Sequence, residues 1–189
     1  MVRMDLEQEK KLVERAKSDP EAFGELYDRH YSQIFGYVLR RTASVEAAQD
    51  ITSEVFFKAL KNLRRFRWRR VPFSSWLYRI ASHEIANYFR KNKKSQLSLE
   101  EVPGRISLSD TSAESEVLEA EAELKRHREY LALHENISRL PIKYQEVITL
   151  RFFENKELKE IGEILGKPEG TVKSLLHRGL EKLRKLMDE

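Results

Sequence analysis

A short run of alternating cations and aromatic rings is the first part of this sequence that suggests chemistry. It comprises residues 64–70, Arg-Arg-Phe-Arg-Trp-Arg-Arg, and is followed by Phe73 and Trp76. Arginine neutralises phosphates, and exposed rings stack on unpaired bases at about 1–3 kcal/mol per base. Recognition of a duplex needs no such rings, so the pattern indicates binding of a separated nucleic-acid strand.

The alternative is that the rings pack in a core and the arginines form a solvated face. For Trp76 we favour the core, because this residue falls on the apolar side of a predicted helix. For Trp68, which arginines flank on both sides, we favour a role at the surface.

The C-terminal segment has the pattern of a helix-turn-helix. Gly166 suits the left-handed position that ends a helix, and Pro168 suits the entry of the next one. The first helix has its apolar face at Leu158, Ile161, Ile164 and Leu165, and the second at Val172, Leu175, Leu176, Leu180, Leu183 and Leu186. An ordinary helical hairpin with a solvated basic face is the alternative.

In a helix-turn-helix, the second helix puts its N-terminal side chains into the major groove of DNA. The residues expected to reach base edges or flanking phosphates are Thr171, Lys173, Ser174, His177 and Arg178. Lys182, Arg184 and Lys185 come too late in the helix to contact bases, and we expect them to face the DNA backbone or water.

Residues that catalysis or metal binding would require are absent or scattered. There is no cysteine, which excludes disulfides, a cysteine-based zinc site and a thiol sensor. The five histidines form no His-x-x-x-His pair, and the sequence contains no phosphate loop and no GxSxG motif. We therefore expect no catalytic residue, no metal site, no cofactor and no small-molecule substrate.

Charge divides the 189-residue chain more sharply than its net value of +4 suggests. Residues 61–94 contain eleven Lys or Arg and one acid, whereas residues 96–123 contain eight acids and one base. The first stretch suits an anionic partner, and the second suits a solvated linker. We expect a cytoplasmic protein without membrane insertion, because no long apolar run and no apolar leader occur.

Helical periodicity recurs along the chain, and no window shows the alternation of a strand. Asp19-Pro20-Glu21 predicts a helix start, Ser44 is expected to cap a second helix, and Ser74 or Ser75 a third. A helix is expected to resume near Ser112 and run to Arg139, and Pro141 to begin another. The predicted fold is all-α: two small helical domains joined by a flexible linker, with the helix-turn-helix at the C-terminus.

Four segments together resemble bacterial RNA polymerase sigma factors of the sigma-70 family, in the extracytoplasmic-function (ECF) group. Residues 50–59, DITSEVFFKA, are similar to the acidic helix that binds the polymerase clamp, and residues 73–81, FSSWLYRIA, with 87–91, NYFRK, to the promoter-melting segment. Leu140-Pro141, with the Glu-Val and Leu-Arg pairs that follow, resembles the start of the second sigma domain. Residues 170–174, GTVKS, and 176–179, LHRG, resemble its recognition helix.

That resemblance implies that different parts of the chain have different functions. Residues 1–94 would bind the polymerase core and open the minus-ten promoter element, 95–124 would be the acidic linker, and 125–189 would bind the minus-thirty-five element. The implied partners are the clamp and flap regions of the core, promoter DNA and an anti-sigma factor. The implied core-binding residues are Gln49, Asp50, Glu54 and Phe57; those for minus-ten recognition and melting are Arg67, Trp68, Arg70, Ser74, Trp76, Arg79, Asn87 and Arg90.

Three positions depart from the usual family pattern, which often has an acid at Gln49, Asn at His83 and Asp at Asn87. They leave the minus-ten sequence preference unpredicted. Two other functions remain open at this point. A stand-alone helix-turn-helix regulator would bind its operator without polymerase, and a purely structural or adaptor helical bundle would bind no nucleic acid.

Overall fold

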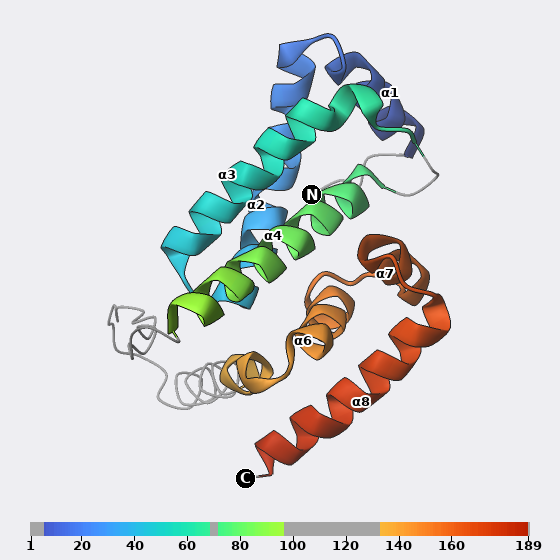
Figure 1. Cartoon of the computed structure of the whole chain (residues 1–189). Coiled ribbons are helices and arrows are strands. Elements are labelled where there is room, and N and C mark those ends of the chain that lie inside the picture. Colours follow the sequence, from blue (N-terminus) through green and yellow to red (C-terminus); the bar gives the residue numbers. More distant parts are fainter. Residues whose placement is uncertain (1–5, 69–71, 97–132, 189) are drawn as a thin grey trace, which may run out of the picture.

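The computed structural model of the chain describes residues 6–68, 72–96 and 133–188 (Figure 1). Every regular element within these ranges is helical, which confirms the all-α fold class. No helix in them is long and apolar enough to cross a membrane.

The described residues of the N-terminal domain form four α-helices: α1 (Leu6–Ala16), α2 (Pro20–Thr42), α3 (Val45–Asn62) and α4 (Phe73–Gln96). Two of the predicted starts are confirmed. The Asp19 side chain accepts a hydrogen bond from the backbone of Glu21 at 3.0 Å, and Ser44 accepts one from Ala47 at 3.2 Å. A short 3-10 turn, η1 (Leu63–Arg65), follows α3.

Helix α1 was not predicted from the sequence, yet it fixes the start of α4. The carboxylate of Glu9 is buried, and its Oε2 accepts a hydrogen bond from the backbone N–H of Phe73 at 3.1 Å. Its Oε1 lies 3.5 Å from Nε2 of His30, whose ring packs on that of Phe73. The prediction that Ser74 or Ser75 caps α4 is therefore wrong: both serines lie within the first turn and are buried.

The described part of the C-terminal domain begins with a helical segment, residues 133–139. It continues with α6 (Ile142–Ile148), the π-helical turn η2 (Thr149–Phe153), α7 (Leu158–Leu165) and α8 (Glu169–Met187). Pro141 precedes α6 directly, as predicted. The remainder of the helix expected from Ser112, and most of the predicted linker, lie outside the described residues.

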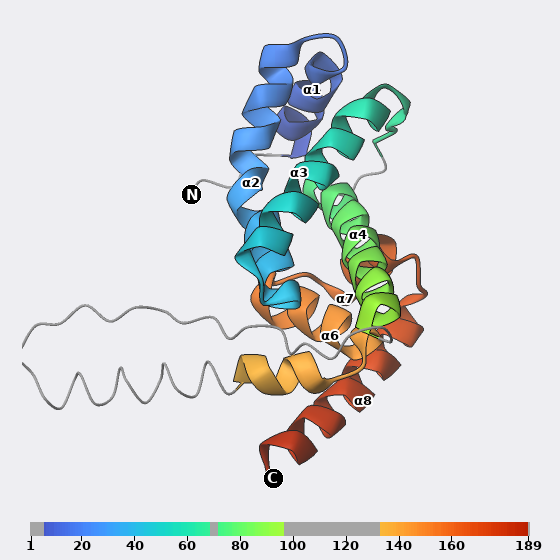
Figure 2. The ribbon, with the colours of Figure 1, turned by 60° about the vertical axis from the view of Figure 1, so that its left-hand side comes forward.

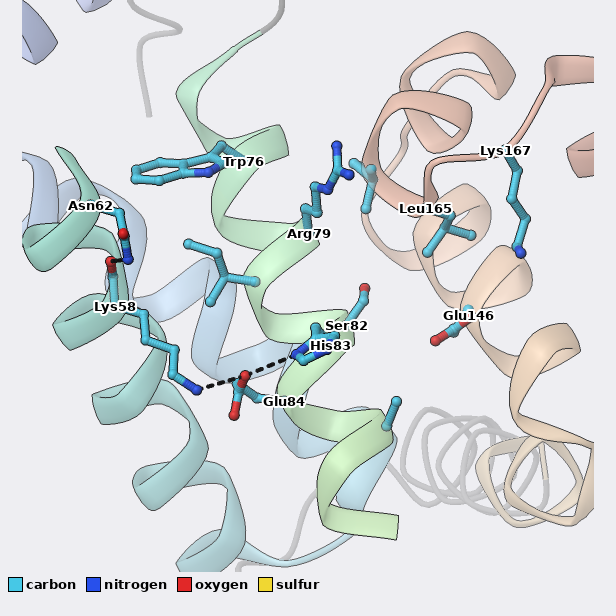
Figure 3. A pocket seen from close by; sticks show the side chains of 13 residues that line it. Lys58, Asn62, Trp76, Arg79, Ser82, His83, Glu84, Glu146, Leu165 and Lys167 are labelled. Carbon is cyan, nitrogen blue, oxygen red and sulfur yellow. Dashed lines mark hydrogen bonds and ion pairs between the residues drawn. The ribbon is translucent and has the colours of Figure 1, made fainter. Parts of the chain in front are cut away.

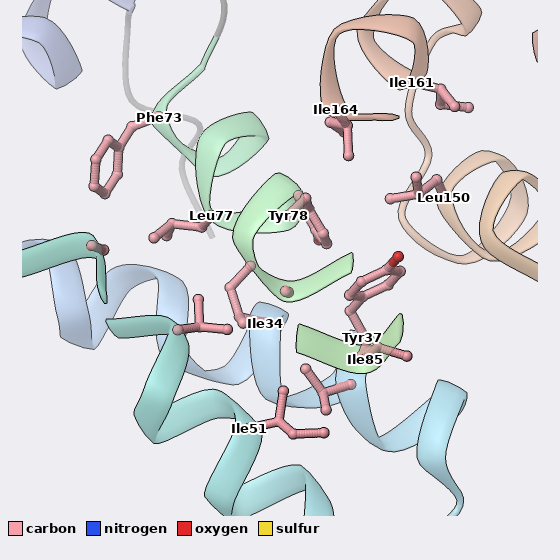
Figure 4. Close-up of a cluster of buried hydrophobic side chains, with 14 of the residues drawn as sticks. Ile34, Tyr37, Ile51, Phe73, Leu77, Tyr78, Ile85, Leu150, Ile161 and Ile164 are labelled. Atoms are coloured by element: carbon pink, nitrogen blue, oxygen red, sulfur yellow. The ribbon is translucent and has the colours of Figure 1, made fainter. Parts of the chain in front are cut away.

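The two domains pack against each other and share one hydrophobic core. Helix α4 lies along α7, and α2 lies against η2 (Figures 1 and 2). At the junction, Tyr37 and Tyr78 of the N-terminal domain face Leu150 and Ile164 of the C-terminal domain (Figure 4). The ring centroids of the two tyrosines lie 5.1 Å apart in an edge-to-face arrangement, and the Tyr37 hydroxyl lies 2.8 Å from that of Ser82. This relative placement of the domains was not predicted from the sequence.

Replacing Glu9 with Ala tests the link between α1 and α4. The change leaves the backbone N–H of Phe73 buried without its acceptor, which costs about 1–3 kcal/mol. We expect a loss of that size in the free energy of unfolding, measured in urea. The matched control is Glu7→Ala, an exposed position on the same helix. Equal stability of the two variants would show that Glu9 does not hold α4.

Candidate nucleic-acid interface

The turn between α7 and α8 has the geometry predicted for a helix-turn-helix. Gly166 ends α7 in the left-handed conformation, with φ 64°. One turn earlier, the carbonyl of Gly162 accepts a hydrogen bond from the Lys167 backbone at 2.9 Å. A Cβ on Gly162 would lie 2.7 Å from the carbonyl oxygen of Lys167, a separation that atoms do not tolerate. Only glycine therefore lets the chain fold back so closely on α7.

Helix α8 is anchored on one side and open on the other. Val172, Gly179 and Leu183 are buried, and a Cβ on Gly179 would lie only 3.2 Å from atoms of Tyr144 and Ile148. Leu180, predicted on the buried side, is 38% exposed. The anchoring fixes which side of α8 faces solvent.

All five predicted minus-thirty-five residues lie on the open side of α8. They are Thr171, Lys173, Ser174, His177 and Arg178, and each is exposed. The hydroxyl of Ser174 donates to the carbonyl of Thr171 at 2.9 Å, and His177 lies 3.6 Å from Glu181. Within the described ranges neither Lys173 nor Arg178 forms an ion pair, so both cations are available to an anionic ligand.

The predicted minus-ten residues are distributed along α4 with different exposure. Arg79 and Arg90 are exposed, and Arg90 donates to the side-chain oxygen of Asn87 at 2.9 Å. Trp76 is half-buried, and its ring is tilted against that of Phe66 with the two centroids 4.7 Å apart. Trp76 therefore lies at the edge of the core, and not within it as the sequence had suggested. Ser74 is buried beneath the C-terminal domain.

The basic aromatic loop is described only in part. Arg67 is exposed, whereas Trp68 is half-buried and packs edge-on against Phe66 at 6.5 Å. The expectation of a surface ring at Trp68 therefore needs correcting: one part of the indole supports the core and another part faces solvent. Arg70 lies outside the described residues.

The predicted core-binding residues share the outer side of α3. Gln49, Asp50 and Glu54 are exposed, and Phe57 is 59% exposed. Sequence reasoning missed Leu60, which is 50% exposed and extends the same stripe. Its spacing of three residues from Phe57 is the signal that could have found it. Exposed rings and aliphatic chains beside acids are typical of a protein-binding surface.

A polar cluster between the domains was not predicted at all. The Glu154 carboxylate, 3% exposed, accepts hydrogen bonds from the Arg40 guanidinium and the Tyr78 hydroxyl. Burial, together with the neighbouring carboxylate, raises the pKa of the Tyr78 hydroxyl, which therefore stays protonated and donates. No local signal in the sequence marks this buried cluster, because Arg40, Tyr78 and Glu154 look like ordinary residues of amphipathic helices.

A second set of contacts lies along the same junction. The Lys156 ammonium, 9% exposed, lies 2.8 Å from Glu160 and 3.4 Å from the hydroxyl of Ser74. The hydroxyl of Ser75 donates to Glu160 at 2.6 Å. Glu146 also faces the N-terminal domain; burial raises the pKa of its carboxyl, although Arg41, 4.0 Å away, opposes the shift.

Beside these contacts, an open cavity of about 670 Å³ lies between the two domains (Figure 3). Trp76, Arg79 and His83 of α4 line one wall, and Leu165 and Lys167 line the other. Lys58 lies at its edge, bound to Glu84 at 2.9 Å and to Glu54 at 3.1 Å.

Comparison with known proteins accounts for both domains. The model for sigma-70 region 2 matches residues 26–95, and the model for sigma-70 region 4 matches residues 130–183. The chain is 35% identical over 184 residues to the ECF RNA polymerase sigma factor SigW of Bacillus subtilis, covering 96% of this chain and 97% of SigW. The chain belongs to the ECF group of sigma-70 family sigma factors, which direct promoter-specific transcription initiation.

Other relatives support the same family assignment. This sigma factor is 32% identical over 182 residues to the ECF RNA polymerase sigma factor BldN of Streptomyces coelicolor, covering 94% of this chain and 65% of BldN. Two solved structures share its fold. CnrH in complex with the cytosolic domain of CnrY has a TM-score of 0.68 at 22% identity, covering 95% of this chain and 97% of CnrH. RpoE of Bartonella quintana, in complex with the anti-sigma factor NepR, has a TM-score of 0.66 at 17% identity, covering 88% of this chain and 96% of RpoE.

Two glycines test the turn of this sigma factor's helix-turn-helix. In Gly162→Ala the new methyl group meets the Lys167 carbonyl, and we expect a loss of about 1–3 kcal/mol or more in the stability of the C-terminal domain. Gly170→Ala is the control, because a Cβ there meets nothing within 4 Å. Thermal unfolding and binding to promoter DNA measure both effects. A Gly162→Ala chain as stable and as DNA-competent as Gly170→Ala would contradict the turn geometry.

Proposed function

We propose that this sigma factor binds the RNA polymerase core through α3, opens the minus-ten element with α4 and the preceding loop, and binds the minus-thirty-five element with α8. The observation that carries the proposal is the exposed N-terminal half of α8, which follows a glycine-dependent turn and presents Lys173 and Arg178, neither of which forms an ion pair with another described residue. Such a helix fits the major groove of B-DNA.

The exposed side of α3 supports a polymerase partner over a stand-alone regulator. A regulator that binds its operator unaided has no use for an apolar stripe of Phe57 and Leu60 flanked by Asp50 and Glu54. A sigma factor needs such a surface to reach its promoter with the core. Polymerisation chemistry then belongs to the core enzyme, and the sigma factor itself acts by binding, without a catalytic group, cofactor or small-molecule substrate.

Cellular location and further partners follow from the same proposal. Core polymerase and promoter DNA place the protein in the bacterial cytoplasm. CnrH and RpoE were each solved with a partner protein, and for RpoE that partner is named as an anti-sigma factor. We infer that an anti-sigma factor also binds this chain.

The core-binding side of α3 is tested by charge reversal. We expect Asp50→Lys with Glu54→Lys to lower affinity for core polymerase by about tenfold or more, because like charges across an interface cost several kcal/mol. The matched control reverses two exposed acids of α2, Glu21→Lys with Asp28→Lys. Pull-down with purified core measures both. Unchanged binding by the α3 double variant would remove this helix from the interface.

Promoter recognition by α8 is tested by two single substitutions. Loss of a bidentate base contact in Arg178→Ala should cost about 1–3 kcal/mol and relax preference at one base pair. Lys185→Ala, further along the helix, should weaken binding uniformly across sequences if it has an effect. Binding to a panel of promoter variants, at one fixed salt concentration, separates the two. A change of sequence preference in Lys185→Ala but not in Arg178→Ala would reverse the placement of α8 on DNA.

A further inference from the structure

We propose that α1 positions the aromatic rings that act in promoter melting, and that Glu9 is the positioning residue. These rings are Phe66, Trp68, Phe73 and Trp76, which together form the ring cluster. The inference rests on the proposed function, which assigns α4 and the loop before it to the minus-ten element. It adds to that function a helix outside residues 26–95, the part of the chain that the sigma-70 region 2 model matches.

The ring cluster has a buried centre and two partly open indoles. The centroid of the Phe66 ring lies 5.6 Å from that of Phe73 and 4.7 Å from that of Trp76. Trp68 packs edge-on against the same ring, at 6.5 Å. Phe73 is fully buried, whereas both indoles are half-buried and keep part of their surface in solvent. Aromatic surface of this kind stacks on any unpaired base, so the indoles suit a separated strand.

Within the described residues, no helix or strand fixes the first half of the ring cluster to the second. Phe66 and Trp68 precede α4, and the described residues between η1 and α4 belong to no helix. The place of Trp68 relative to Trp76 therefore depends on contacts with neighbouring helices. A ring that is held in position before binding loses little conformational entropy when a base stacks on it, which favours binding.

Helix α1 and the residue after it bind the chain at two points beside these rings. Helix α1 lies beside the end of α3 and the start of α4 (Figures 1 and 2). Near its beginning, Oε2 of the buried Glu9 carboxylate accepts a hydrogen bond from the Phe73 N–H at 3.1 Å. Just after its end, the carbonyl of Lys17 accepts one from Nε of Arg64 at 3.4 Å. The chain is therefore held to α1 both before Phe66 and at Phe73.

The Glu9 contact is the stronger of the two, because it is charged and buried. The N–H of Phe73 lies in the first turn of α4, where backbone donors lack an acceptor within the helix and a carboxylate is favourable. His30 of α2 contacts both partners: its Nε2 lies 3.5 Å from Oε1 of Glu9, and its ring centroid 5.7 Å from that of Phe73. Glu9 thus sets the place of Phe73, and Phe73 packs directly against Phe66 and Trp76.

This role differs from general stabilisation of the fold. Leu12, Val13 and Ala16 are buried and attach α1 to the core, so the helix stays in place when the Glu9 contact is lost. Glu9 itself is only 7% exposed, too deep to bind a DNA strand. Its effect on melting therefore passes through the rings that it positions.

Tryptophan fluorescence measures the ring cluster alone, because Trp68 and Trp76 are the only tryptophans of the chain. Two substitutions in the free, full-length sigma factor separate reach from charge. Glu9→Asp keeps the charge but is one methylene shorter, so it should lose the Phe73 N–H and move the emission to longer wavelength as the indoles become more exposed. Glu9→Gln loses the charge but keeps an acceptor oxygen at the same reach, and its emission should match that of the original chain.

Promoter opening gives the functional readout. With core polymerase and a duplex promoter selected by this sigma factor, Glu9→Asp should form open complexes about fivefold or more slowly, as expected for a weakened stacking contact. Permanganate reactivity of unpaired thymines measures the rate. Glu9→Gln and the control Glu7→Ala, an exposed position on α1, should open the promoter like the original chain. Affinity for core polymerase should be equal in all four chains, because the proposed core-binding side of α3 is unchanged.

Three results would overturn this role of Glu9. They are unchanged emission and opening in Glu9→Asp, equal defects in Glu9→Asp and Glu9→Gln, and a shifted emission with a normal opening rate. Failure of every chain, the unmodified one included, to direct transcription would instead contradict the proposed function, because the fluorescence measurement involves neither polymerase nor DNA.

Discussion

The buried Glu154 carboxylate, held between Arg40 and Tyr78, is the interaction on which the arrangement of the whole sigma factor depends. A carboxylate is costly to remove from water, and its burial is tolerated only because two donors from the other domain meet it. Those donors come from α2 and α4, so one side chain of the C-terminal domain fixes both helices against it. Tyr37, Tyr78, Leu150 and Ile164 surround the cluster with apolar surface.

This constraint explains why the three proposed binding surfaces differ in exposure. The sides of α3 and α8 that carry Asp50 and Arg178 point away from the junction and remain open. On α4, by contrast, Ser74 is buried at the junction, whereas Arg79 and Arg90 are exposed. Because Glu9 of α1 also accepts a hydrogen bond from Phe73, contacts from both domains hold the N-terminus of α4.

Features that depend on neighbouring residues were predictable from the sequence. Asp19 and Ser44 cap helices through backbone groups two or three residues away, and Gly166 ends α7 by its own conformation. The exposed residues of the recognition helix follow from its apolar periodicity in the same way. These features sufficed to predict the all-α fold and, with the resemblance, the family.

Features that depend on distant partners were not predictable. Arg40 and Glu154 lie 114 residues apart, and Phe73 and its cap Glu9 lie 64 residues apart. Nothing in the local pattern distinguishes such buried charges from solvated ones, since both occur on amphipathic helices. For the same reason Ser74 and Ser75, which look like helix caps, turn out to be contacts between the domains.

The most direct measurement is the distance between the two domains when the Glu154 carboxylate loses one of its donors. The chain has no cysteine, so Lys61→Cys on α3 and Glu163→Cys on α7 can carry two spin labels. The account predicts one short distance in the otherwise unmodified chain and an added, longer population in Tyr78→Phe, which keeps the ring but lacks the hydroxyl that Glu154 binds. The control is Glu157→Gln, an exposed acid of the same segment, which should leave the distance unchanged. Identical distance distributions in all three chains would contradict the dependence of the domain arrangement on Glu154.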